Sequence, residues 1–304
     1  MEFRLAEEKD TLAIKKLWSY SFESYQPYFD WYFHTIYSPQ RTLGLWEKEN
    51  LLASLQLAPY KMQIRGQALD CNYIVGVITS PACRGRHIGW QLMQEALAYL
   101  QKNSLPLAVL KPAASDFYYK LGFSFCYEDI IWKMPLLSIK NLLPPKNEAL
   151  IQWQAIDIID IPQNIIFLDQ IFQGMNQNPA HKLNGYILRN QMNWQNYLEE
   201  HLGDGCRCWL MKRNGLPAAY LLFLLKDKQF QLREMAFIDF QAQKEAFAFI
   251  YGHQNEAENF IWTAPSWDKS YLQLTYQNGL ALHPSKMGKI IHIPQTLSLI
   301  SYPA

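Results

Sequence analysis

The sequence lacks a dominant sign of charge. Its 28 lysine and arginine residues face 27 aspartate and glutamate residues, which leaves a formal net charge of +1 at neutral pH. A balance this even gives no support for a general nucleic-acid or membrane-surface partner. Long hydrophobic runs are also lacking: none approaches the roughly 20 residues that cross a bilayer, and the N-terminus is not a signal peptide. We therefore expect a cytoplasmic protein with no nucleic-acid partner and no membrane partner.

Cysteine is scarce as well, with five residues in 304. An odd number in a long chain does not suggest a disulfide framework. Cys206 and Cys208 stand in an alternating, strand-like run, and no second cysteine or histidine pair follows at metal-ligand spacing. We expect all five thiols to be reduced and structural, and we expect no metal site.

Length and apolar content are what the chain does have. With 304 residues, 49% of them hydrophobic, it can build a large core and two domains. Aromatic residues make up 14%, so most of them must lie in the core, with some left for a ligand cleft. The best linker is 142–148, where two prolines precede polar residues. It predicts domains at 1–143 and 149–304.

Both halves show the same order of expected elements, which predicts a structural repeat of mixed α/β (α+β) architecture. Each half is expected to hold a mixed, mainly antiparallel sheet flanked by helices. In the first half we expect strands at 3–6, 42–46, 51–64, 69–79, 107–110 and 125–134, and helices at 13–22 and 88–100. In the second half we expect strands at 152–155, 206–212, 217–225, 230–238 and 260–264, and helices at 160–174, 187–202 and 242–251.

The chemistry centres on Ile74–Gly89, where an apolar, β-branched run leads into a basic, glycine-containing loop. Apolar residues recur with helical spacing after the loop, so the order is strand, loop, helix. Such a loop presents unpaired backbone N–H groups and the positive end of the helix dipole, which together bind phosphate. Arg84 and Arg86 add charge that can pair with phosphate oxygens.

Two common phosphate-binding patterns do not fit this loop. The P-loop requires Gly-Lys-Ser/Thr, and the dinucleotide fingerprint requires a different glycine spacing. The loop instead resembles the acyl-CoA loop of the Gcn5-related N-acetyltransferases (the GNAT superfamily), in which Arg or Gln, two residues, Gly, one residue and then Gly or Ala follow one another. The resemblance rests on Arg84, Gly85, Arg86, His87, Ile88 and Gly89. His87 replaces the usual Gly, so it needs a backbone that tolerates a Cβ, or a wider loop.

A second motif follows at the family's usual separation. The run 117–123 is similar to the signature in which a Tyr stands four residues before Gly-Phe, and Tyr118 holds that place. The resemblance implies that Tyr118 protonates the departing CoA thiolate; the alternative is an aromatic packing residue beside Phe117. It also implies acetyl-CoA as cosubstrate, no metal, and cofactor contacts from Val77, Ile78, Thr79, Arg84, Gly85, Arg86, His87, Ile88, Gly89, Ala113 and Ala114. Backbone groups at Val77–Thr79 would polarise the acetyl carbonyl.

An aromatic segment near the N-terminus would border the acceptor cleft of such a domain. Phe22, Trp31 and Tyr32 are the candidate walls, and Glu23 and Asp30 are the nearest carboxylates for a cationic acceptor. The alternative is that these aromatic residues belong to the core and that the acids are solvated. The general base stays open between Glu23, Asp30 and a water relay.

The second half repeats the elements without the chemistry. The stretch 239–245 has no glycine and more acidic than basic residues, so it would repel a diphosphate. We predict a degenerate GNAT-like domain there. A working GNAT domain, a degenerate one and the segment 287–302 together resemble the enhanced intracellular survival (Eis) family. A sterol-carrier-like domain normally follows in that family and supplies the base, and we expect this chain, which stops at Ala304, to lack it.

The resemblance implies transfer of acetyl from acetyl-CoA to a primary amine of an aminoglycoside-like molecule, a polyamine or a lysine side chain. Eis-family members are commonly dimers or hexamers, which adds a homo-oligomer to the expectations. Two alternatives come from other classes of protein. One is a non-catalytic acyl-CoA-binding sensor, which His87 and the missing third domain favour. The other is an assembly protein in which both halves are degenerate.

Overall fold

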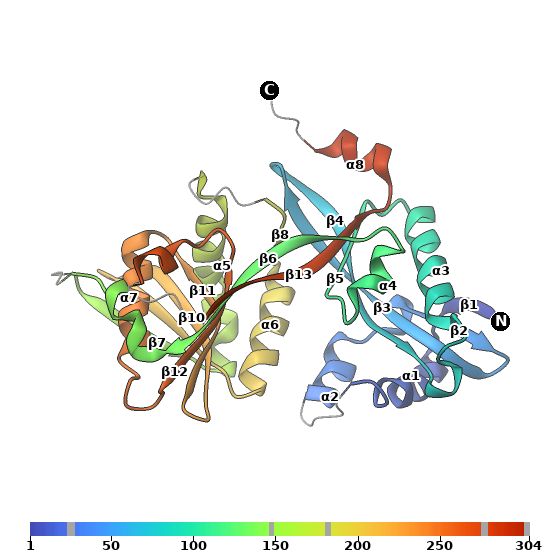
Figure 1. Ribbon diagram of the computed structural model, residues 1–304, viewed down its shortest axis with the longest axis horizontal. Helices are drawn as coiled ribbons and strands as arrows, with labels where there is room; N and C mark the ends of the chain where they lie inside the picture. Colours follow the sequence, from blue (N-terminus) through green and yellow to red (C-terminus); the bar gives the residue numbers. More distant parts are fainter. Residues whose placement is uncertain (23–27, 146–148, 180–183, 275–278, 301–304) are drawn as a thin grey trace. The chain divides into compact units, whose positions relative to one another are not determined.

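The computed structural model describes residues 1–22, 28–145, 149–179, 184–274 and 279–300, and the chain folds into two compact units (Figure 1). Unit 1 consists of Met1–Tyr127, Asn184–Leu188 and Ser285–Ala304, and unit 2 of Glu128–Leu183 and Arg189–Pro284. No helix in these described ranges is long and apolar enough to span a membrane. All five cysteines are free thiols.

Unit 1 is built on a mixed sheet with the strand order β1-β2-β3-β4-β5-β13, and β8 pairs with the far end of β3. Most neighbours are antiparallel, whereas β4 and β5 are parallel. The strands are β1 (Glu2–Leu5), β2 (Thr42–Glu47), β3 (Asn50–Ile64), β4 (Gln67–Thr79), β5 (Leu107–Leu110), β8 (Tyr186–Leu188) and β13 (Leu280–Ile290), and β6 (Ser124–Pro135) begins in this unit.

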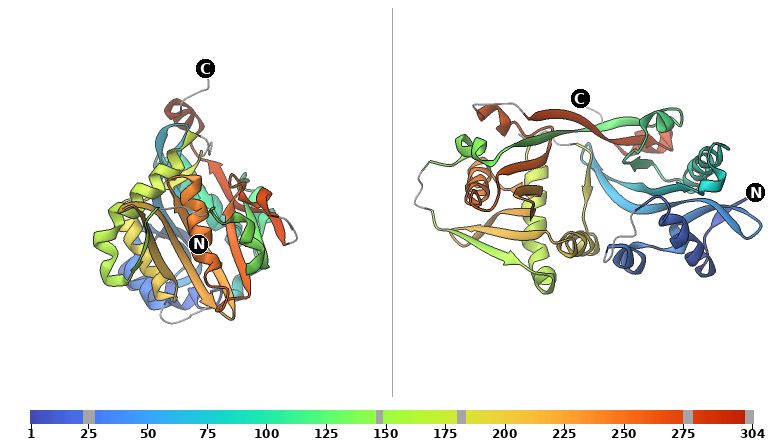
Figure 2. Two further views of the ribbon diagram at one scale, coloured as in Figure 1. Left: turned by 90° about the vertical axis from the view of Figure 1, so that its left-hand side faces the viewer. Right: turned by 60° about the horizontal axis from the view of Figure 1, so that its bottom comes forward.

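Helices cover both faces of the unit 1 sheet (Figure 2). On one face lie α3 (Ile88–Lys102) and α4 (Ser115–Tyr119); α3 buries one stripe of side chains at helical spacing, namely Ile88, Leu92, Met93, Ala96 and Leu100. On the other face lie α1 (Thr11–Trp18), α2 (Tyr28–Trp31) and the π-helix η2 (Tyr32–Ile36). The other helices of this unit are η1 (Glu8–Asp10), η3 (Pro39–Arg41), η4 (Pro81–Cys83) and α8 (Ile293–Leu299).

Unit 2 has a sheet with the order β6-β12-β11-β10-β9-β7. Its further strands are β7 (Ile151–Ile156), β9 (Arg207–Arg213), β10 (Leu216–Lys226), β11 (Gln229–Phe237) and β12 (Asn259–Pro265). Its helices are η5 (Leu136–Leu142), η6 (Ile158–Asp160), α5 (Ile161–Gln177), α6 (Gln191–Gly203), α7 (Phe240–Tyr251) and η8 (Ser270–Gln273). The parallel crossover β11–α7–β12 repeats β4–α3–β5 of unit 1. The predicted fold class, with a mixed sheet flanked by helices in each half, is confirmed.

The helix predicted at 187–202 is wrong in its first turn. Tyr186–Leu188 is strand β8, which pairs with Lys61–Gln63 of β3. Helix α6 begins at Gln191, because the Asn190 side chain caps it by accepting a hydrogen bond from the Asn193 N–H at 2.8 Å. Pairing with a strand far away in the sequence leaves no local signal, and the spacing of the apolar residues here also fits a helix.

The end of the chain returns to unit 1. Met287–Ile290 of β13 pair antiparallel with Leu107–Leu110 of β5, and Met287 is fully buried in the core that α3 covers. The compact units are therefore interleaved along the chain, with Glu128–Pro135 of β6 in unit 2 and Ser285–Ile290 of β13 in unit 1. The boundaries predicted from the sequence, a catalytic GNAT domain at 1–143 and a degenerate GNAT-like domain at 149–304, stay a prediction.

Met287→Ala tests this return. Truncating a fully buried methionine should lower the free energy of unfolding by about 2–5 kcal/mol, because transfer energy is lost and a cavity is left. Leu282→Ala on the same strand is the matched control, since that side chain is 63% exposed and should matter little. Urea unfolding followed by circular dichroism measures both variants. Equal stability of the two would show that this end of β13 does not pack into unit 1.

Candidate active site

Strand β4 carries a bulge where it approaches the predicted cofactor loop. Ile78 pairs with Ser54 and Val75 with Gln56, so Gly76 and Val77 both stand opposite a single residue of β3. Gly76 has φ +62°, and a Cβ there would lie 2.5 Å from the Trp18 ring. Glycine is required at this position for both reasons. Pairing with β3 resumes at Ile78 and Thr79, and the bulge adds a local bend and twist to the end of β4.

Beyond the bulge, β4 and β5 separate. The two strands pair only from Cys71–Leu107 to Tyr73–Val109, and β5 ends at Leu110 while β4 continues to Thr79. Within the described residues, the β4 edge from Ile74 to Thr79 that faces β5 has no strand partner. Its backbone N–H and C=O groups can therefore bind a ligand, as the sequence predicts for Val77, Ile78 and Thr79.

The loop after β4 ends in a left-handed residue. Gly85 has φ +77° and His87, the residue before α3, has φ +59° and ψ +14°. The left-handed conformation of His87 explains why the family pattern usually has glycine at this position, and histidine is among the side chains that adopt it more readily. The backbone at His87 therefore tolerates a Cβ, which is the first of the two alternatives predicted for this loop. No side chain caps α3, so its first N–H groups stay open.

A cavity of about 670 Å³ lies at the start of α3. Six predicted residues line it: Thr79, Arg84, Gly85, His87, Ile88 and Gly89. Gly89 allows close approach to β4, since a Cβ there would lie 2.9 Å from Thr79 Oγ1. Five further lining residues were missed by the sequence analysis, namely Cys83, Trp90, Asp116, Phe117 and Lys120. Asp116 and Lys120 are four residues apart, a spacing that places both on one face of a helix. This spacing is the sequence signal that could have identified them.

The remaining predicted cofactor residues do not line this cavity. Val77 packs against the core beneath α3, whereas Ile78 is buried on the opposite face of the sheet. Arg86, Ala113 and Ala114 are exposed. The site therefore divides into a loop cavity and a strand edge.

Tyr118 lies in α4 within the same buried cluster as Ile88 and Val77. Its ring meets Phe117 edge to face at 5.0 Å between centroids. Burial raises the pKa of its phenol above the ordinary value, so the hydroxyl stays protonated across the neutral range. Tyr118 does not line the loop cavity. Tyr118 stays the predicted acid, because it packs in the core cluster that also contacts Val77 of β4 and contains Ile88 of α3.

Lys289 of strand β13 contacts the turn that follows Tyr118. The Lys289 ammonium on β13 donates a hydrogen bond of 2.8 Å to the Leu121 carbonyl. Gly122 next to it has φ +80°, and a Cβ there would lie 2.5 Å from Lys289 Nζ. The glycine of the Tyr motif is thus favoured by its left-handed backbone, and Lys289 lies directly beside it.

The predicted acceptor wall is only partly packed into the core. Tyr32 is buried, stacks on Trp18 at 4.8 Å and donates a hydrogen bond of 2.8 Å to Gln56 Oε1. Phe22 is 42% exposed with its ring 4.6 Å from that of Trp18. Trp31 is half-buried and Asp30 is exposed. Glu23 lies outside the described residues. Gln56, which the sequence analysis missed, shares this face.

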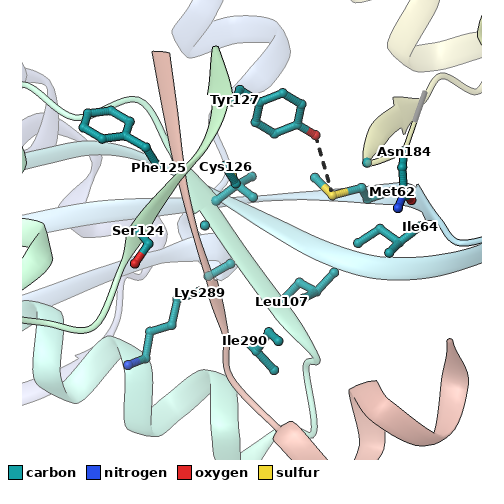
Figure 3. A pocket seen from close by; sticks show the side chains of 14 residues that line it. Met62, Ile64, Leu107, Ser124, Phe125, Cys126, Tyr127, Asn184, Lys289 and Ile290 are labelled. Atoms are coloured by element: carbon teal, nitrogen blue, oxygen red, sulfur yellow. Dashed lines mark hydrogen bonds between the residues drawn. The ribbon is translucent and has the colours of Figure 1, made fainter. Parts of the chain in front are cut away.

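Unit 1 has a second cavity, of about 330 Å³, on the sheet face away from α3 (Figure 3). Its walls are mainly apolar and include Met62, Ile64 and Leu107. The Tyr127 hydroxyl faces Met62 Sδ at 3.9 Å. Its cation is Lys289, whose ammonium already donates to Leu121. A diphosphate therefore fits the loop cavity better than this one.

The corresponding helix of unit 2 is closed at its start. Asp239 caps α7 by accepting a hydrogen bond of 2.7 Å from the Ala242 N–H. Arg213 pairs with the same carboxylate, with Nη1 at 3.2 Å from Oδ1, and with Glu245 at 3.4 Å. Burial raises the pKa of Asp239, but Arg213 and the backbone donors outweigh it and hold the pKa below its ordinary value. A built-in carboxylate thus occupies the position that a phosphate would need.

Unit 2 also holds a buried ionic cluster. Arg189 forms two hydrogen bonds with Glu234, of 2.7 and 2.6 Å, and lies over the rings of Phe172, Trp194 and Tyr197. Burial raises the pKa of Glu234, but Arg189 and hydrogen bonds from the tyrosine hydroxyls outweigh it and lower the pKa. Strongly shifted pKa values are typical of functional sites, but structural ion-pair networks shift pKa values as well. Here the charges are paired, so the cluster serves the core of unit 2.

Comparisons with known proteins agree with this geometry. A family model described as an acetyltransferase (GNAT) domain matches residues 2–126, and another with the same description matches residues 185–291. No curated protein matches the chain.

Solved structures share the fold over nearly the whole chain. A GCN5-related N-acetyltransferase from Anabaena variabilis aligns with a TM-score of 0.82 at 19% identity, over 99% of this chain and 76% of that one. A probable N-acyltransferase from Enterococcus faecalis gives 0.82 at 16% identity, over 98% and 75%. Eis1 from Mycobacterium abscessus gives 0.75 at 11% identity, over 100% and 77%. At these identities the likeness shows the fold.

The two matched ranges together span more than half of the sequence and carry one family description, so the chain belongs to the GNAT acetyltransferases. It carries two GNAT domains in tandem, in the arrangement that Eis1 also has. The protein is an N-acetyltransferase, which implies an amine-bearing acceptor.

Glu234→Gln should lower the free energy of unfolding by about 1.5–3 kcal/mol at neutral pH, because Arg189 loses its charged partner. The wild-type advantage should last down to the ordinary glutamate pKa of 4.5 and vanish as the pH falls through the lowered folded-state pKa. Urea unfolding at a series of pH values measures this. Glu258→Gln, which breaks the exposed pair with Lys228, is the control and should change nothing.

His87→Val should lower the free energy of unfolding by about 1–2 kcal/mol relative to His87→Gly, because a β-branched residue is strained in the left-handed region. The same pair of substitutions at Arg86, which has negative φ, should show no such gap. Thermal unfolding of the four variants is the measurement. A gap of equal size at both positions would mean that His87 is not left-handed in solution.

Proposed function

We propose that unit 1 transfers acetyl from acetyl-CoA to a primary amine. The observation that carries the proposal is the open cavity at the uncapped start of α3, beside the unpaired edge of β4. Backbone N–H groups, the helix dipole and Arg84 together suit a diphosphate. The two cavities of unit 1 differ in this respect, and the apolar one offers no such arrangement.

Each predicted residue has a role in this proposal. Residues Arg84–Gly89 hold the diphosphate, Ala113 and Ala114 flank the pantetheine end, and the backbone at Val77–Thr79 polarises the thioester carbonyl. The neutral amine attacks that carbonyl, the C–S bond breaks, and the thiolate takes the Tyr118 proton. The amine's own proton passes to water or to an acceptor-side carboxylate, among which Asp30 is exposed.

The acceptor is proposed to be a small aminoglycoside-like molecule, a polyamine or a lysine side chain. Aromatic rings at Phe22 and Trp31, with the exposed carboxylate of Asp30, suit a cationic amine on that side of β4. Unit 2 does not bind the cofactor in this proposal, because Asp239 already occupies the start of α7. Its fold and its closed helix support the role of a degenerate partner domain.

Tyr118→Phe tests the assignment of the acid. Turnover should fall by roughly 10²–10⁴-fold, the range for general-acid catalysis, while CoA affinity stays unchanged. Release of free CoA thiol over a panel of amines gives the rate, and calorimetry gives the affinity. Tyr119→Phe is the matched control, since that neighbouring side chain is 48% exposed. Full turnover in Tyr118→Phe would remove this residue from the mechanism.

A sensor that binds acyl-CoA without turning it over is the second candidate. The substitution of His87 for the usual glycine favours it, because an exposed imidazole borders the cavity. The same two assays separate the candidates. Binding with no thiol release on any amine would support the sensor, and no binding at all would support an assembly protein.

A further inference from the structure

The loop cavity has a wall that the phosphate-binding loop does not supply. Helix α4 contributes Asp116, Phe117 and Lys120, and the first turn of α3 contributes Trp90. The loop and the start of α3 suffice for a diphosphate. A cavity of about 670 Å³ is large enough for a nucleoside as well. This second wall therefore faces another part of the ligand.

An aromatic pair forms the middle of that wall. The rings of Trp90 and Phe117 meet edge to face, with centroids 6.0 Å apart at 88°. Both side chains are half-buried, so each keeps part of its ring exposed toward the cavity that it lines. Aromatic rings of this kind bind a flat nucleobase by stacking, whichever polar groups that base carries.

Lys120 supplies a positive charge at the end of the same wall. The side chain is exposed and, among the described residues, forms no ion pair; Asp116, one helical turn earlier, does not pair with it. Arg84 supplies the charge on the loop side of the cavity. The cavity thus has two separate cationic positions with an aromatic pair beside one of them. A lysine ammonium is a compact charge on a flexible stem and suits a phosphate monoester.

We propose, on the basis of the proposed function, that the Trp90–Phe117 pair holds the adenine of CoA and that Lys120 binds the 3′-phosphate of its ribose. A ribose phosphate monoester carries more negative charge than either phosphate of the diphosphate, so it gains most from a cation of its own. The protein then distinguishes CoA from 3′-dephospho-CoA through one side chain.

Calorimetry of the full chain with CoA and with 3′-dephospho-CoA tests the proposal. The wild type should bind CoA about tenfold more tightly, the effect of one charge-assisted hydrogen bond. Lys120→Met should lower CoA affinity to that of 3′-dephospho-CoA and leave the latter unchanged, and Lys120→Arg should keep the preference. Lys102→Met, at the exposed far end of α3 and outside the cavity, is the charge-matched control and should change neither affinity.

Trp90→Leu separates the two parts of the wall. Loss of stacking should weaken CoA and 3′-dephospho-CoA by the same factor, so that their ratio is kept. Equal affinities in the wild type, or a preference that survives in Lys120→Met, would overturn the assignment of Lys120 while CoA binding still upholds the proposed function. Failure of the wild type to bind either compound would overturn both.

Discussion

The open start of helix α3 is the constraint on which the rest of unit 1 depends. A helix begins with N–H groups that its own backbone cannot satisfy, and a side-chain cap, water or a ligand can satisfy them. Helix α7 of unit 2 does so with Asp239, which Arg213 holds in place. Helix α3 has no such cap: the residue before it is His87 in a left-handed conformation, and the His87 side chain does not cap the helix. The same crossover is therefore open in one unit and closed in the other.

Strand β4 contributes the other half of the site through the edge that β5 leaves without a strand partner. Trp18 fills the space that a side chain at Gly76 would need, so the bulge has glycine there, and β5 ends before β4 does. Trp18, which stacks on Tyr32, thus contacts the strand whose free edge is proposed to polarise the thioester.

The return of the chain to unit 1 connects its last strand to the Tyr118 motif. Pairing of β13 with β5 brings Lys289 to the Leu121 carbonyl, next to Gly122, whose positive φ favours glycine. Unit 2 differs in two places: Asp239 caps the start of α7, and the buried charges of Arg189 and Glu234 pair with each other.

The sequence by itself determined the order of elements, the basic loop before a helix and the Tyr motif, because periodicity and turn chemistry depend on neighbouring residues. It also predicted that residues 239–245 would not accept a diphosphate, although the cap and its partner Arg213 appeared only in the structure. The tertiary structure alone decided that Tyr186–Leu188 is a strand, that β13 completes the first sheet and that Trp90 and Lys120 share a cavity with Arg84. These features depend on contacts between residues far apart in the chain, for which local patterns carry no signal.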